Sequence, residues 1–153
     1  MKPLIVLLTV FILSLVIFRL FQKKTNFIAA GNIAMAAMLF FTSIGHFMYL
    51  EGMSEMLPDW IPGRKLIVLI TGFIEIAAGV GLLVTRTRRI VGGLLILFFI
   101  CIVPANIYAA IHHVDIETGA RTGAGPGYLW FRIPLQIFFI AWVYWFSVRL
   151  RKG

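Results

Sequence analysis

Apolar residues form five long runs along the 153-residue chain, and short polar stretches separate these runs. The runs lie at 3–18, 27–50, 66–84, 90–111 and 128–148. Most of them are close to the ~20 residues that a helix needs to cross a hydrocarbon core. The runs are continuously apolar and do not alternate with polar residues, which favours helices over a β-barrel. The pattern therefore predicts an all-α integral membrane protein with five spans.

The first run follows Lys2 and resembles the apolar part of a signal peptide. It lacks a small-residue cleavage site, however, and the basic stretch "RLFQKK" comes directly after it. We therefore expect a retained transmembrane helix. The predicted organisation is one membrane domain over residues 1–153, in which an additional N-terminal span (1–24) joins a four-helix transmembrane bundle (27–148).

The composition is typical of a membrane protein and not of a soluble domain. Hydrophobic residues make up 61% of the chain, charged residues only 13%, and the mean hydropathy is +0.97. A soluble domain of this size needs far more polar surface. The net charge of +8 lies in short tracts between apolar runs, which is typical of lipid-headgroup contacts. We expect the lipid bilayer, and no nucleic acid, as the partner of these charges.

Basic residues predict the orientation. They gather at 19–24, 86–89 and 149–152, which share one side of the membrane if all five runs cross it. The positive-inside rule assigns that side to the cytoplasm, so the N-terminus is predicted outside and the C-terminus inside. The other connections hold every acidic residue except Glu75, namely Glu51, Glu55, Asp59, Asp115 and Glu117.

Glu75 is the one acidic residue inside an apolar run, in "ITGFIEIAAG". It lies about nine residues into its run, or ~14 Å along a helix, which is near the bilayer midplane. An intramembrane carboxylate normally faces a partner or a wet cavity. Under the predicted topology, the other polar side chains within the runs all lie in the outer half, and nothing comparable lies in the inner half. They predict one polar site that opens outward; its members beside Glu75 are His46, Asn106, Tyr108, Arg132 and Gln136.

Arg132 is the predicted counter-ion of Glu75, and Gln136 lies one helical turn further on the same face. A Glu75–Arg132 pair would neutralise both charges. Several alternatives remain open: Glu75 could be protonated, and the polar residues could merely fasten helices together. The candidate catalytic residues are Glu75, Arg132 and His46; the candidate ligand-binding residues are Asn106, Gln136 and Tyr108.

The remaining histidine, acidic and cysteine residues show no pattern that is typical of catalysis or metal binding. The segment "HHVDIE" at 112–117 matches no strong metal-binding template, and we expect solvated loop residues and no metal. Cys101 is the only cysteine, so no disulfide forms within the chain. Pro104 and Pro134 are expected to kink their helices.

A set of motifs in the second to fifth runs resembles the DoxX-like family of small bacterial membrane proteins. The motifs are "GHF", "MLPDWIP", "GFIE" followed by "RTRR", "PANIY" and "RIPLQ", in that order, over roughly residues 43–146. The resemblance implies a four-helix core in the bacterial cytoplasmic (inner) membrane. It also implies that His46, Glu75, Pro104, Asn106, Arg132 and Gln136 are polar core positions, and it implies a link to membrane redox chemistry.

Three functional hypotheses follow, and the sequence leaves the oligomeric state open. In the first, the protein is a quinone- or lipid-facing subunit of a membrane or soluble oxidoreductase. The chain has no haem, iron–sulfur or dinucleotide motif, so a quinone would be the cofactor and electrons would come from a partner or small substrate. In the second, the protein is a non-catalytic scaffold or ligand-binding protein. In the third, it is a small-solute transporter or a lipid-modifying enzyme such as an isomerase.

Overall fold

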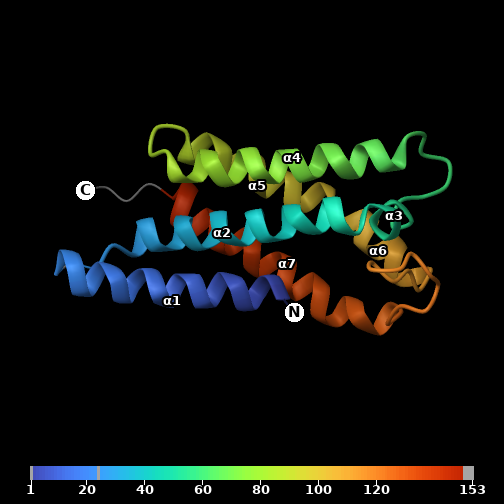
Figure 1. Cartoon of the computed structure of the whole chain (residues 1–153), viewed down its shortest axis with the longest axis horizontal. Helices are drawn as coiled ribbons and strands as arrows, with labels where there is room; N and C mark the ends of the chain where they lie inside the picture. The colour runs from blue at the N-terminus through green and yellow to red at the C-terminus, as the bar shows by residue number, and fades with distance from the viewer. Residues whose placement is uncertain (1, 24, 150–153) are drawn as a thin grey trace.

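Helices account for all the regular secondary structure of the part of the chain that the computed structural model describes, residues 2–23 and 25–149 (Figure 1). Three spans are single helices: α1 (Lys2–Gln22), α2 (Phe27–Met48) and α4 (Arg64–Leu83). The fourth is divided into α5 (Arg88–Cys101) and α6 (Val103–Ile111). The fifth runs through a 3-10 turn (Pro126–Tyr128), α7 (Leu129–Val143) and a π-helical turn (Tyr144–Val148), and a short helix α3 (Leu50–Ser54) precedes α4.

Five helical stretches are long and apolar enough to cross a membrane, which confirms the predicted number of apolar helices. The first is longer than the apolar run at 3–18 suggested, because Arg19 and the residues after it continue the helix to Gln22. The second begins at Phe27, directly after Asn26, whose side chain accepts a hydrogen bond from the amide of Ala29 at 3.0 Å. This bond caps an otherwise unpaired donor at the start of α2.

The helix α2 lies at the centre of the bundle and is the most buried of the five spans. It packs against α1 on one side and α4 on the other, while α7 runs obliquely from the α6 end of the molecule toward the α4–α5 turn (Figure 1). Every span contributes to one apolar core: Leu7, Ala34, Met35, Met38, Leu39, Leu82, Leu95, Phe99, Phe139 and Val143.

The fourth span is interrupted at Ile102, two residues before Pro104. Proline has no amide hydrogen and its ring clashes with the carbonyl four residues earlier, here that of Ile100. The chain therefore restarts as α6, with Pro104 in its first turn. Pro134, by contrast, lies inside α7, which continues past it. The expected kink at Pro104 is thus a full break between two helices.

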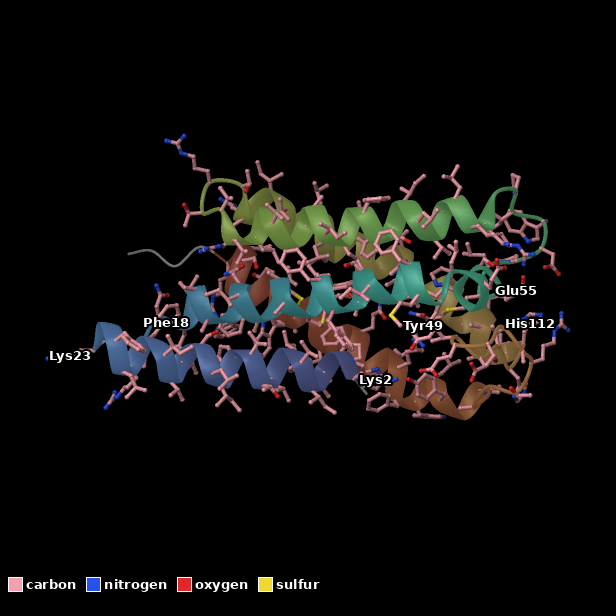
Figure 2. All side chains as sticks on the ribbon, in the orientation of Figure 1. Lys2, Phe18, Lys23, Tyr49, Glu55 and His112 are labelled. Carbon is pink, nitrogen blue, oxygen red and sulfur yellow. The ribbon has the colours of Figure 1, made fainter. Side chains whose placement is uncertain are left out.

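The charged residues separate toward the two ends of the bundle. Figure 2 shows Lys23 at one end and Glu55 and His112 at the other. We call the first the basic end; it also holds the α4–α5 turn with Arg86 to Arg89. We call the second the acidic end; it holds α3, the α3–α4 connection and the loop 112–125.

Candidate functional site

Glu75 is buried between α4 and α2, and its partners come from α2. The Thr42 hydroxyl donates a hydrogen bond to Oε2 of Glu75 at 2.8 Å, and His46 Nε2 lies 3.6 Å from Oε1. Two glycines permit this approach. A Cβ on Gly72 would lie 2.9 Å from the His46 Cβ, and one on Gly79 would lie 2.8 Å from the Phe40 ring. Both contacts are closer than real Cβ atoms allow, so the backbone of α4 at these two glycines lies directly against side chains of α2.

The other ring nitrogen of His46 fixes the proton arrangement. Nδ1 lies 2.9 Å from the carbonyl oxygen of Val68 and 3.1 Å from the Thr71 hydroxyl. A carbonyl can only accept, so Nδ1 carries a proton, and Nε2 is left to face Glu75. Nε2 of His46 and the hydroxyl of Thr42 are therefore the two polar groups that face the Glu75 carboxylate.

The predicted Glu75–Arg132 pair is wrong. Glu75 makes its ion pair with His46, and Arg132 makes none with any residue that the structure describes. The reason is the order of helices around the bundle. The helix α4 packs against α2, α3 and α5, whereas Arg132 belongs to α7, which packs against α2, α5 and α6. The single predicted polar site is therefore two separate sites.

Arg132 lines a cavity of about 230 Å³ at the acidic end, which we call the Arg132 cavity. Its guanidinium carbon lies 5.8 Å from the centre of the Tyr128 ring, and the side chain is half-buried. The walls come from α6, the loop 112–125 and the start of α7: Asn106, Ala109, Ala110, Val114, Asp115, Ile116, Glu117, Gly123, Ala124, Gly125, Tyr128 and Arg132.

The loop that closes the Arg132 cavity is held by hydrogen bonds within itself and by contacts with α1 and α3. The Asp115 carboxylate oxygen Oδ1 accepts hydrogen bonds from the amides of Glu117 and Thr118 at 2.8 and 2.9 Å. Lys2 of α1 pairs with Glu117 at 3.1 Å. Beneath the loop, a Cβ on Gly52 of α3 would lie only 2.0 Å from the carbonyl oxygen of Ile116. These contacts give the cavity a defined roof.

Asn106 and Gln136 are neighbours, as their polar character predicts, but they contact different parts of the protein. Asn106 lines the Arg132 cavity and donates to Gln136 Oε1 at 3.2 Å. Gln136 is buried and donates to the carbonyl of Phe99 at 2.6 Å, just before the break at Ile102. Gln136 thus supplies a donor where the helix ladder is interrupted, which is a structural role.

Tyr108 lies outside the Arg132 cavity. Its ring stacks on that of His112 with centres 4.0 Å apart, and the His112 Nδ1 atom lies 2.9 Å from the Tyr108 carbonyl. His113 is exposed. In the described ranges, no group of three or more histidine, cysteine or acidic side chains is arranged to hold a metal ion.

A polar cluster that the sequence did not predict lies near the basic end. Asn32 is buried in α2 and donates to the carbonyls of Ile28 and Phe146 at 2.7 and 2.9 Å, and it accepts from the Ser147 hydroxyl at 2.8 Å. The expectation that the inner half holds no comparable polar group is therefore wrong. An asparagine six residues into an apolar run was the available signal. Its contacts secure the π-helical turn against α2.

Comparison with protein families shows which family the chain belongs to. The profile of a family described as a domain of unknown function, DUF8561, matches residues 35–147, which is most of the sequence. The chain belongs to the DUF8561 family. No curated protein and no solved structure matches it.

The DoxX-like resemblance is wrong, because the family match is to DUF8561 and not to a DoxX-like profile. The motifs that suggested it are short and built from glycine, proline and aromatic residues. Such residues recur in membrane helices for general reasons of packing and interface placement. The family shown for this chain carries no assigned activity, so function has to be argued from the two polar sites.

Proposed function

We propose that this DUF8561 protein is a multi-pass protein of the bacterial cytoplasmic membrane that binds a small anionic ligand in the Arg132 cavity. The N-terminus would lie outside and the C-terminus inside, so the cavity would open on the outer face. The role is that of a binding protein, without chemistry on the ligand.

Two features support membrane insertion in this orientation. Large apolar side chains on α1, α4, α5 and α7 point away from the bundle, among them Ile12, Phe73, Leu97 and Ile137, each more than half exposed. Apolar surface of this extent marks contact with lipid. At the basic end, the tracts around Lys23, Arg86–Arg89 and Arg149 would meet the cytoplasmic leaflet.

The single observation that carries the binding role is the state of Arg132. It is a half-buried cation within a membrane-length helix and has no ion-pair partner among the described residues. A charge in such a place is costly unless it is paired. Basic residues elsewhere at the acidic end, such as Arg64 and Lys65, do have carboxylate partners. An anion in the cavity would supply the missing partner of Arg132.

The quinone-linked redox hypothesis loses the family resemblance on which its redox link depended. One of the candidate catalytic residues, Glu75, is paired with His46, and neither residue is among those that line the Arg132 cavity. A quinone is uncharged and would leave Arg132 without a counter-charge. We therefore keep a quinone as an outcome of the experiment and not as the proposal.

The test is mass spectrometry of small molecules and lipids retained by gently purified protein. The comparison uses wild type, Arg132→Gln, Arg132→Lys and the control Arg121→Gln, whose side chain is exposed in the loop outside the cavity lining. We expect one class of anion in wild type, Arg132→Lys and Arg121→Gln, and its loss in Arg132→Gln. Thermal unfolding in detergent identifies folded variants. Equal retention by folded Arg132→Gln, or retention of a neutral quinone, would overturn the proposal.

A further inference from the structure

The Arg132 cavity carries two unbalanced charges of opposite sign. Arg132 contributes a cation from α7, and Asp115 contributes a carboxylate from the roof loop. Neither forms an ion pair with any residue in the described ranges, not even with the other. The second acidic residue of the lining, Glu117, is already paired with Lys2 at 3.1 Å. Arg132 and Asp115 are therefore one positive and one negative group that line the same cavity without an ion-pair partner in the described ranges.

The carboxylate of Asp115 is held in its charged form by the loop itself. The backbone amides of Thr118 and Glu117 donate to Oδ1 and keep the pKa of the Asp115 carboxyl below its ordinary value. The second oxygen, Oδ2, makes none of these bonds and stays available for a donor. A ligand ammonium group suits that oxygen, because an ionised carboxylate only accepts hydrogen bonds.

We propose that the ligand of the Arg132 cavity is a zwitterion, in which a phosphate or carboxylate group binds Arg132 and a primary ammonium group binds Asp115. This inference rests on the proposed function, since it specifies the anion that the cavity binds. Guanidinium groups pair well with phosphate and carboxylate, whose oxygens match its fork of donors. The ammonium group explains why an anion-binding cavity also carries an unpaired acid.

The size of the cavity limits the ligand to a small one. Its volume of about 230 Å³ is below the roughly 300–1,000 Å³ of pockets for drug-sized molecules. Ala109, Ala110 and Val114 form an apolar part of the lining, and Asn106 and Tyr128 add further polar groups to it. Two sources share the required chemistry: a free amino acid or amino-alkyl phosphate, and the ethanolamine phosphate headgroup of a membrane lipid.

The experiment compares pairs of probes that differ only in the amine. Binding of O-phosphoethanolamine and of ethyl phosphate is measured by calorimetry on detergent-purified full-length protein. Alanine is compared with propionate in the same way. In nanodiscs, native mass spectrometry compares retention of phosphatidylethanolamine with that of phosphatidylethanol. We expect the amine-bearing probe to bind at least about tenfold more tightly, since a hydrogen bond between charged groups contributes roughly 1.5–3 kcal/mol.

Three variants test which residue causes the preference for the amine-bearing probe. Asp115→Asn keeps an Oδ1 acceptor for the turn but removes the charge, so we expect it to bind both members of a pair equally. Arg132→Gln should lose both members. Glu55→Gln is the control, because it removes an acidic charge at the same end of the bundle outside the cavity lining. It should keep the wild-type preference.

Failure of this inference is distinct from failure of the proposed function. Equal binding of the amine-bearing and amine-free probes to wild type, with loss of both in Arg132→Gln, would refute the zwitterion and leave the anion site standing. Binding of neither charged probe, free or as a lipid headgroup, would overturn both. Retention of the amine preference by folded Asp115→Asn would also refute the assignment of the ammonium group to Asp115.

Discussion

His46 on α2 and Glu75 on α4 face each other at 3.6 Å, with the second imidazole nitrogen committed to a backbone carbonyl. The two side chains therefore fasten two helices at a point where Gly72 of α4 lets α2 approach closely. This pair answers how a carboxylate is accommodated in the middle of an apolar helix. It also makes the stability of the α2–α4 contact depend on both residues together.

We predict strong coupling between Glu75 and His46. Glu75→Gln and His46→Gln should each destabilise the protein by about 2–4 kcal/mol, because each leaves a buried polar group without its partner. The double variant should lose less than the sum, by at least about 1 kcal/mol. Unfolding in detergent with denaturant measures all three. The matching cycle of Glu75→Gln with Arg132→Gln should be additive within about 0.5 kcal/mol; coupling there would restore the rejected pair.

Gly72 offers a test of the close helix contact. Gly72→Ala places a Cβ 2.9 Å from that of His46 and should destabilise the protein by about 1–3 kcal/mol through forced separation of α2 and α4. Gly93→Ala is the matched control, since nothing lies within 4 Å of its Cβ position. It should be neutral or slightly stabilising, because alanine favours helix. Similar melting temperatures for the two variants would contradict this packing.

Gln136→Met is predicted to weaken the junction between α5 and α6. The substitution removes the donor to the Phe99 carbonyl from a buried position, at a cost of about 1–3 kcal/mol. The neighbouring Ile137 is exposed, so Ile137→Met serves as the control and should change stability little. Detergent unfolding measures the difference. If both variants unfold alike, the helix break does not depend on Gln136.

The orientation predicts which connections can be labelled from outside intact cells. In a Cys101→Ala background, Thr122→Cys in the roof loop should react with an impermeant maleimide, and Thr87→Cys in the α4–α5 turn should react only after lysis. Both native threonines are exposed, so accessibility within the protein does not separate them. The reverse labelling pattern would invert the topology.

The roof loop should tolerate mild acid. Because the folded pKa of Asp115 lies below its ordinary value, its stabilising bonds persist above the unfolded value of about 3.9 and are lost as pH falls through the folded value. Exchange of the Glu117 and Thr118 amides, corrected for intrinsic rates, should therefore be unchanged from pH 7 to pH 5. Asp115→Ala should raise that exchange throughout this range. An increase in wild type near pH 5 would contradict the depressed pKa.

The sequence predicts the spans well because hydropathy and length are local properties. The five apolar helices and the break near Pro104 both follow from residues close together in the chain. Depth along a helix is equally local, which is why His46 and Glu75 were both recognised as members of a polar site. Rotation and neighbour order are not local. Nothing near Arg132 indicates that α2 and not α7 faces Glu75, although Gly72 and Gly79 mark the face of α4 that meets another helix.

Asn32 is another residue whose contacts the sequence does not predict. Its polarity was visible, but its partners include the carbonyl of Phe146, which becomes available in a π-helical turn far along the chain. Likewise, Asp115 looked like a solvated loop residue, and only the fold of the loop 112–125 over α6 and α7 brings it to the Arg132 cavity. The local pattern of apolar and polar residues does not predict which residues far along the chain such side chains will meet in the fold.

The contact between Gly52 and the carbonyl of Ile116 determines which residues of the loop can change without moving the roof. One part of the seat of the roof is backbone against backbone, and this part does not depend on which side chains the loop carries. Ala120, Arg121 and Thr122 are exposed, and their side chains take no part in that seat. Asp115→Asn would then change the charge presented to the ligand while keeping an Oδ1 acceptor for the turn. Gly52 has no such freedom, because any side chain there would push the Ile116 carbonyl, and the roof with it, away from α3.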